Sequence, residues 1–113
     1  MIKVSVFYPN TKGARFDFQY YCDRHIPMVR AKLGKACKGA EVQRGLAVAS
    51  TGSLLSFVAA GHLYFDSVED FQASIGPHAD EFRRDIPNYT NIEPFFEFSE
   101  VTLPLELRDA AQQ

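Results

Sequence analysis

The chain has 113 residues, a length typical of one domain with a hydrophobic core of its own. Apolar residues make up 46% and charged residues 23%, and the net charge of −2 offers no basic surface to nucleic acid or to an anionic membrane. The first residues alternate like a strand rather than a signal peptide, and no apolar run is long enough to cross a bilayer. We therefore expect a cytoplasmic protein with reduced cysteines, which binds neither nucleic acid nor membrane.

The first half of the chain predicts a strand, a helix and a second strand. Residues 1–8 alternate between apolar and polar positions, which is typical of a strand. Asp17 is a suitable N-cap for the next helix, whose apolar stripe is expected to contain Phe18, Tyr21, Cys22 and His25. Pro27 predicts that this helix ends or kinks there, with a further turn or two up to Leu33. Residues 38–49 predict the second strand.

The second half predicts a strand, two short helices and a last strand. Residues 50–53 are expected to form a turn, and residues 56–66 a strand that is buried on both faces. Ser67 and Asp70 form a capping-box pattern before a helix that Gly76 ends, and Pro77 is well placed to start another. Residues 92–103 predict the fourth strand, with Pro94 near its start, and residues 104–113 a polar C-terminal tail.

This order of elements is β-α-β-β-α-β, and it predicts a single domain over residues 1–113. A short internal echo supports two βαβ halves, because "RHIP" at residues 24–27 returns as "RDIP" at residues 84–87. Right-handed crossovers in both halves give an α+β, ferredoxin-like fold with a four-stranded antiparallel sheet and both helices on one face.

The other face of such a sheet would expose aromatic side chains, including Phe7, Tyr64 and one set from "FFEF" at residues 95–98. An apolar face of this size is not normally left in water. We therefore expect a homodimer packed sheet to sheet, a dimeric α+β barrel, with a small-molecule pocket between the sheets. Phe7, Tyr64, Phe96 and Phe98 are the residues expected to shape the site for a small hydrophobic organic ligand.

Three segments carry a resemblance to a known family. They are "ARFDFQYYCDRHIPMV" at 14–29, "GHLYFDSVEDFQ" at 61–72 and "GPHADEFRRDIPNYTNIEP" at 76–94. With them the chain resembles the EthD family of the dimeric α+β barrel superfamily over nearly its whole length. The resemblance implies a ferredoxin-like protomer and a dimer with a pocket in or beside each barrel. Members of this family often accompany oxidative catabolic or polyketide-type enzymes, which makes an oxygenase a candidate partner.

His25 is the leading candidate for a catalytic group, because imidazole titrates near neutral pH and acts as an acid or base. Its helical stripe turns it towards the sheet, and Tyr21 lies one turn earlier, close enough for the two side chains to meet. The alternative is that His25 caps the C-terminus of the helix and binds a free carbonyl there.

The other candidates are less distinctive. His62 lies within an apolar strand, where it either faces the ligand and positions a substrate oxygen or is a core histidine held by a hydrogen bond. A surface role is expected for His78. In "DIPNYT", Asn88 and Tyr89 are candidate ligand-binding residues, although a turn or capping role would also explain Asp85 and Asn88.

No known metal or nucleotide motif occurs in the chain, so we expect neither a metal site nor a cofactor. Three hypotheses of function remain open. The first is an enzyme for a small apolar molecule, with His25 moving protons and Tyr21 or His62 positioning the substrate; its chemistry would be cofactor-free oxygenation, cyclisation or isomerisation. The second is a non-catalytic ligand-binding or accessory protein that supports an oxygenase. The third is a structural dimer whose pocket is filled by its own side chains.

Overall fold

The computed structural model describes residues 1–48 and 54–108. In chain order its elements are β1 (Ile2–Pro9), α1 (Phe18–Tyr20), the π-helix η1 (Tyr21–His25), α2 (Ile26–Leu33), η2 (Gly34–Ala36), β2 (Gly39–Arg44), β3 (Phe57–Phe65), α3 (Val68–Ile75), η3 (Gly76–His78), α4 (Ala79–Asp85), η4 (Ile86–Asn88) and β4 (Phe95–Glu100). Across these two ranges, no helix combines the length and apolarity that a membrane span requires.

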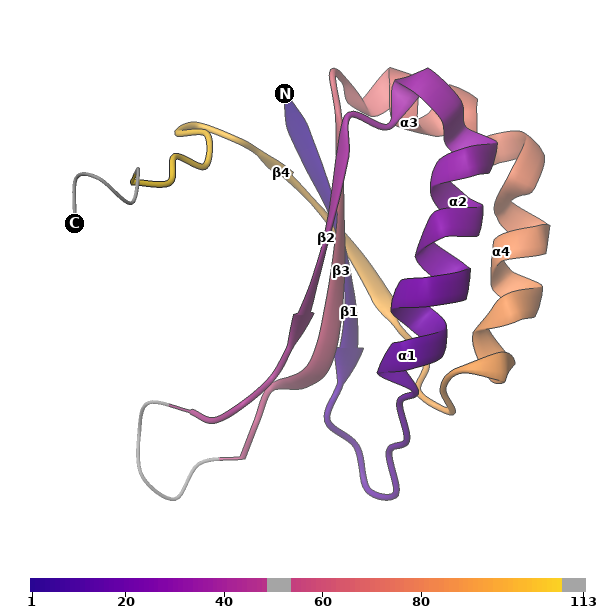
Figure 1. Cartoon of the computed structure of the whole chain (residues 1–113), viewed down its shortest axis with the longest axis vertical. Helices are drawn as coiled ribbons and strands as arrows, with labels where there is room; N and C mark the ends of the chain where they lie inside the picture. The colour runs from indigo at the N-terminus through magenta and orange to yellow at the C-terminus, as the bar shows by residue number, and fades with distance from the viewer. Residues whose placement is uncertain (49–53, 109–113) are drawn as a thin grey trace.

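The four strands form one antiparallel sheet in the order β2-β3-β1-β4. All helices lie on one side of this sheet, and its other face is open (Figure 1). This arrangement confirms the predicted α+β, ferredoxin-like fold.

Two strands are shorter than predicted. β2 ends at Arg44, and Leu46 and Val48 beyond it are exposed rather than paired. β4 begins at Phe95, directly after Pro94, because proline has no N–H to donate to the sheet. The predicted turn at residues 50–53, the last residue of the predicted second strand and residues 109–113 of the tail lie outside the described residues.

The first helical segment begins after Asp17 and ends at Leu33, as predicted. The Asp17 carboxylate accepts a hydrogen bond from the Tyr20 backbone N–H at 3.0 Å, which is the expected N-cap. The segment does not end at Pro27, but the further turns predicted up to Leu33, with Gly34 after them, are confirmed. Pro27 lies in the first turn of α2, where its missing N–H is tolerated, and the helical segment runs on to Leu33. Gly34, with a φ of 64°, then ends it.

The π-helical turn η1 changes which residues of this segment are buried. The Ile26 N–H bonds to the Tyr21 carbonyl five residues earlier, so this turn contains one residue more than an α-helical turn. Tyr21 and His25 both face the sheet and are 2% and 6% exposed. Cys22, which the α-helical spacing placed on the same stripe, is exposed instead.

The sheet register determines which side chains face the helices. Val6 of β1 pairs with Gly61 of β3 on the helix-covered face, and Ser5 pairs with His62 on the open face. The structure explains why position 61 is a glycine, because a Cβ there would overlap the hydroxyl oxygen of Tyr21. The absence of a side chain on β3 therefore allows the Tyr21 phenol to reach the sheet.

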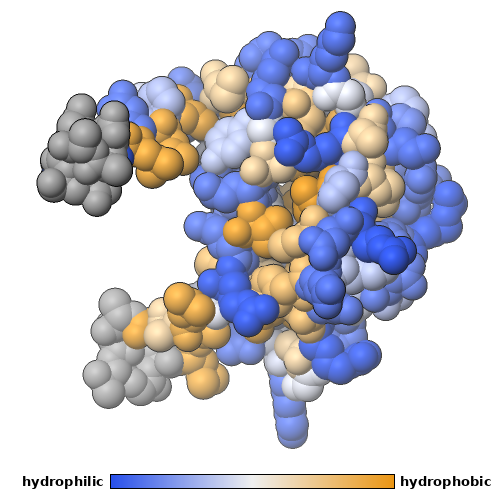
Figure 2. Space-filling view, viewed as in Figure 1, coloured by the Kyte–Doolittle hydropathy of each residue, from blue (hydrophilic) through white to orange (hydrophobic). Residues whose placement is uncertain are grey.

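The open face of the sheet lies between two projecting segments, one from the β2–β3 connection and one that follows β4. In Figure 2 both carry apolar surface, and the molecule is hollowed between them. Exposed apolar side chains of these regions are Leu46, Leu54, Leu103, Leu105 and Leu107. The segment over residues 104–108 is thus less polar at its surface than the sequence suggested, because alternate leucines point into solvent.

Candidate functional site

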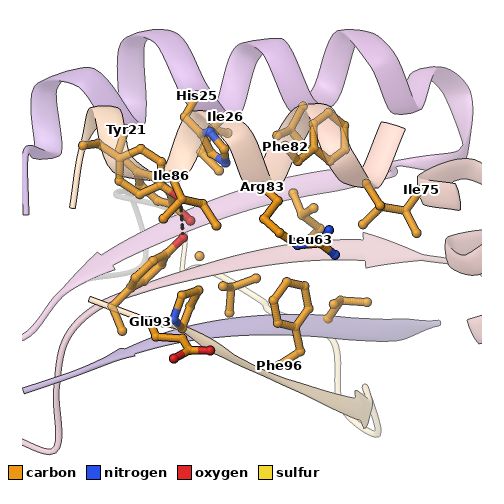
Figure 3. A pocket seen from close by; sticks show the side chains of 18 of the residues that line it. Tyr21, His25, Ile26, Leu63, Ile75, Phe82, Arg83, Ile86, Glu93 and Phe96 are labelled. Carbon is orange, nitrogen blue, oxygen red and sulfur yellow. Dashed lines mark hydrogen bonds between the residues drawn. The ribbon is translucent and has the colours of Figure 1, made fainter. Parts of the chain in front are cut away.

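A cavity of about 330 Å³ lies inside the single chain, between the helices and the covered face of the sheet. Its walls are mainly aliphatic and aromatic, and its residues come from β1, η1, α2, β3, α3, α4 and β4 (Figure 3). The lining includes Val4, Val6, Tyr8, Tyr21, His25, Ile26, Val29, Gly61, Leu63, Phe71, Ile75, Ala79, Phe82, Arg83, Ile86, Tyr89, Glu93, Pro94 and Phe96. Its size and apolar character suit a small organic ligand.

His25 is the imidazole of this cavity, whose lining also includes the charged side chains of Arg83 and Glu93 (Figure 3). The ring is 6% exposed and stacks almost parallel to Tyr21, with 5.4 Å between ring centroids and 13° between planes. This contact confirms the expected i, i+4 pairing. The capping alternative for His25 is wrong, because the residue lies within a helical segment that continues for two further turns.

Asp85 holds His25 from the side away from the cavity. The distance between His25 Nδ1 and Asp85 Oδ2 is 2.8 Å. The Tyr20 hydroxyl donates to Asp85 Oδ1 at 2.7 Å, and the Asn88 amide donates to the same oxygen at 2.9 Å. Each carboxylate oxygen thus has a partner, so the carboxylate is fixed in orientation and fixes the imidazole in turn.

This contact determines the tautomer of His25. An ionised carboxylate only accepts hydrogen bonds, so Nδ1 must carry the proton and Nε2 the lone pair. No buried nitrogen or oxygen of a side chain lacks a partner among the described residues. Nε2 has no protein partner in those residues, so it is not fully buried, and the cavity that the ring lines is the space we assign to it.

The pKa values of the pair favour the same state. Burial lowers the pKa of His25 below 6.5, and the hydrogen bond and charge of Asp85 oppose this only in part. Burial alone would raise the pKa of Asp85, but hydrogen bonds from Tyr20, Asn88 and His25 outweigh it, so the pKa lies below 3.8. At neutral pH the site therefore contains a neutral imidazole beside an ionised carboxylate.

Two buried phenols, Tyr21 and Tyr89, contact the ring, and a third, Tyr8, contacts both of them. Tyr8 and Tyr89 share a hydrogen bond of 2.7 Å between their hydroxyl oxygens, and the Tyr89 ring lies 4.7 Å from the His25 ring. Burial is the largest cause that raises the pKa of Tyr8, Tyr21 and Tyr89 above the usual 10. All three remain protonated at neutral pH and can only act as neutral hydrogen-bonding groups.

His62 lies on the opposite face of the sheet from His25. Its Nδ1 is 2.7 Å from the Ser5 hydroxyl, and its Nε2 is 2.6 Å from the Gln43 side-chain oxygen. Burial, followed by the charge of Lys3, lowers the pKa of His62. Both ring nitrogens are occupied by protein groups, so His62 takes no part in the cavity that His25 lines, and the two histidines do not converge.

The other expected ligand-binding residues divide between the two faces. Tyr89 and Phe96 line the cavity, whereas Phe98 packs edge-on against Phe71 beside it. Phe7 and Tyr64 lie on the open face, so the cavity observed within the chain is not the pocket that was expected between two sheets. A role for Phe7 and Tyr64 in an inter-sheet pocket stays a prediction.

Asn88 contributes through Asp85 rather than by lining the cavity, and His78 lies outside it, stacked on Phe82 with 6.0 Å between ring centroids. In the described part of the chain, no cluster of three or more His, Cys, Asp or Glu side chains is arranged to hold a metal ion. Of the three histidines, only His25 lines the cavity, and Asp85 holds it in place.

Sequence reasoning missed the roles of Asp85, Tyr20 and Tyr8. Asp85 was interpreted as a turn or capping residue, although one signal pointed further. His25 and Asp85 occupy the same position in the echoed tetrapeptides "RHIP" and "RDIP". The isoleucines that follow them, Ile26 and Ile86, both line the cavity. The echo thus marks the place where the two halves of the fold meet.

Together, this fold and this cavity define a small ferredoxin-like α+β protein with a buried histidine–carboxylate pair over an apolar pocket. The EthD domain model matches residues 13–93, and the chain belongs to this family. No curated protein matches the chain.

Solved structures support the assignment. An EthD-like protein from Ralstonia eutropha JMP134 is 50% identical, with a TM-score of 0.85 over 90% of this chain and 92% of its own. An ethyl tert-butyl ether D family protein from Bacillus halodurans C-125 is 18% identical, with a TM-score of 0.59 over 88% and 97%. A dimeric protein of unknown function and ferredoxin-like fold from Bacteroides fragilis NCTC 9343 is 12% identical, with a TM-score of 0.53 over 88% and 94%. The latter two resemble this chain in fold alone.

Proposed function

We propose that this protein binds a small, mostly apolar organic molecule in the cavity and that His25 acts on it as a general base. The observation that carries the proposal is the hydrogen bond of 2.8 Å between His25 Nδ1 and Asp85, which leaves Nε2 for the cavity. A neutral imidazole held by a carboxylate is a common arrangement for proton abstraction. The apolar walls exclude water from the reacting atoms, which keeps the imidazole neutral before reaction and strengthens the attraction between Asp85 and the imidazolium that forms.

Proton abstraction is the first step shared by the reaction classes considered for this protein. Isomerisation returns the proton to another atom of the same molecule, and cyclisation uses the resulting carbanion or alkoxide as a nucleophile. Cofactor-free oxygenation would require that the substrate anion itself reduce dioxygen. In each case His25 Nε2 takes the proton, Asp85 stabilises the imidazolium, and the Tyr20 and Asn88 hydrogen bonds hold Asp85 in place.

The test begins with the molecule that the protein retains. Protein purified without denaturation is analysed by mass spectrometry for bound small molecules, and any molecule found is incubated with fresh protein. We expect His25→Ala to reduce conversion by roughly 10²- to 10⁴-fold, the usual range for loss of a general base. His78→Ala removes the same side chain outside the cavity and serves as the matched control. Conversion that is equal in His25→Ala and His78→Ala would refute the role of His25.

A second candidate function is binding without conversion, as a carrier or as an accessory protein for an oxygenase. The apolar lining favours this alternative, because His25 is the one imidazole on the cavity walls and a single anchor is sufficient for binding. A retained ligand that stays chemically unchanged with active protein, but is lost in His25→Ala, would favour this function over catalysis.

The open face of the sheet supports a homodimer as part of the proposal. Phe7 contacts Phe57 and Phe95 on this face, with ring centroids 5.2 and 5.4 Å apart, and Phe95 is 48% exposed. Aromatic surface of this kind is normally covered. We expect sedimentation of wild type as a dimer and of Phe95→Asp as a larger fraction of monomer. Gln72→Glu, an exposed change on the helix side, is the control, and a monomeric wild type would contradict the dimer.

A further inference from the structure

The cavity end formed by His25 has a defined hydrogen-bonding polarity. Asp85 Oδ2 lies 2.8 Å from Nδ1 and can only accept, so the ring nitrogen that faces the cavity presents a lone pair. A ligand atom that meets Nε2 must therefore donate a proton. An ether, ketone or carboxylate oxygen in the same place would set lone pair against lone pair in a site with little water.

The neighbouring phenols complement this polarity. Tyr8, Tyr21 and Tyr89 have three hydroxyl protons between them, and the hydrogen bonds of Tyr8 with Tyr89 and with Tyr21 use two. The third proton remains for a further acceptor, and all three side chains line the cavity. The polar end of the cavity thus contains one acceptor and one spare donor, which is the complement of a hydroxyl group, since a hydroxyl both donates and accepts.

We infer that the ligand is an apolar molecule with a hydroxyl group, such as a phenol or an enol, whose O–H donates to His25 Nε2, and that Asp85 sets this selectivity through the imidazole tautomer. The inference rests on the proposed function, because it requires that the cavity bind a ligand. It goes further by naming the chemical group that the site recognises and the residue that determines this choice.

The network also predicts how to reverse the selectivity. In Asp85→Asn, the Tyr20 hydroxyl and the Asn88 amide both still require an acceptor where Asp85 Oδ1 now lies. They fix the amide oxygen there and turn the new NH₂ towards His25 Nδ1. The amide then donates to Nδ1, the proton of the ring moves to Nε2, and the cavity presents a donor instead of an acceptor. The side chains have nearly the same size, so the cavity keeps its shape.

The test uses a matched pair of probes, 2-naphthol and 2-methoxynaphthalene, whose dissociation constants are measured by calorimetric or fluorescence titration at neutral pH. Wild type is expected to prefer 2-naphthol by roughly tenfold, as for one buried hydrogen bond. Asp85→Asn should abolish or invert this ratio, and His78→Ala should leave it unchanged. The bulk of the methoxy group affects wild type and Asp85→Asn equally, so the change in the ratio reports the tautomer.

The outcomes separate the two proposals. Binding of neither probe would overturn the proposed function and this inference with it. Binding of both probes with a ratio that Asp85→Asn leaves unchanged would overturn this inference alone. If Asp85→Asn does not fold, as judged by circular dichroism, acidification of wild type provides the second test. Protonated His25 donates from both nitrogens, so the preference for 2-naphthol should disappear at low pH, and its persistence there would refute the inference.

Discussion

Substitution of Gly61 by alanine should destabilise the protein through a single contact with Tyr21. A Cβ at position 61 would overlap the Tyr21 hydroxyl oxygen and lie 3.2 Å from Cζ of the same ring. Both residues are buried, and the backbone of β3 is fixed by strands on both sides, so the phenol must move. Overpacking of this kind costs about 1–3 kcal/mol. For a chain of this length the Tm should fall by roughly 4–12 °C.

A double-mutant cycle identifies the contact responsible. Tyr21→Phe in the wild-type background should cost about 1 kcal/mol, because the buried hydroxyl loses its hydrogen bond with Tyr8. In the Gly61→Ala background the same change removes the overlapping oxygen and should cost nothing or stabilise. The expected coupling is therefore at least about 1 kcal/mol, measured by urea unfolding followed by circular dichroism.

Gly76→Ala is the matched control for the effect of adding a methyl group to a glycine. Gly76 has helical backbone angles, with φ of −48° and ψ of −50°, and nothing lies within 4 Å of an added Cβ. Alanine there should be neutral or stabilise by about 0.4–1 kcal/mol. A Gly61→Ala variant as stable as Gly76→Ala, or costs that simply add in the double mutant, would refute the proposed contact.

Three further predictions concern charge and capping. Acidification from about pH 7 to 5 should reduce the free energy of unfolding, because burial lowers the pKa of His25 and the unfolded chain therefore binds the proton more readily. Urea titrations should show that this free energy depends less on pH in His25→Gln than in wild type. Ser67→Ala should cost about 1 kcal/mol, because the Ser67 hydroxyl accepts from the Asp70 N–H at 3.1 Å; an unchanged urea midpoint would contradict the cap. Tyr20→Phe should raise the pKa of Asp85, observed by carboxyl NMR titration, so that stability is lost at a higher pH on acidification; an unchanged pKa would show that this bond does not hold the carboxylate.

The fold was predictable because its signals are local. Alternation in residues 1–8, the Asp17 and Ser67 caps and the glycine and proline positions each report on a few neighbouring residues. The π-helical turn before α2 was not predictable in this way, since it depends on how Tyr21 and His25 pack on the sheet. Its consequence was the wrong assignment of Cys22 to the buried stripe.

The site was only half predictable, because Asp85, the residue that holds His25, lies sixty positions away from it in the sequence. The helical stripe gave His25 and Tyr21, but no local pattern distinguishes a carboxylate that ends a helix from one that binds a distant imidazole. The exposed aromatic residues predict a pocket on the open face, which stays a prediction, and no sequence signal predicts the cavity on the helix-covered face that His25 lines. Only the echo of "RHIP" in "RDIP" linked His25 to Asp85 in the sequence.

That echo has a physical basis in the symmetry of a ferredoxin-like fold. Its two βαβ halves are related by an approximate twofold axis, so equivalent positions of the two helical segments lie close together when they are near this axis, as His25 and Asp85 do. One half contributes a base at this point, and the other contributes the carboxylate that orients it. Gly61 is a second example of a contact whose partner is not predictable from the sequence. A glycine within a buried strand indicates that another group approaches the backbone closely, but only the folded chain shows that this group is the Tyr21 phenol beside His25. In both cases the sequence marks a contact position, and the fold supplies the partner.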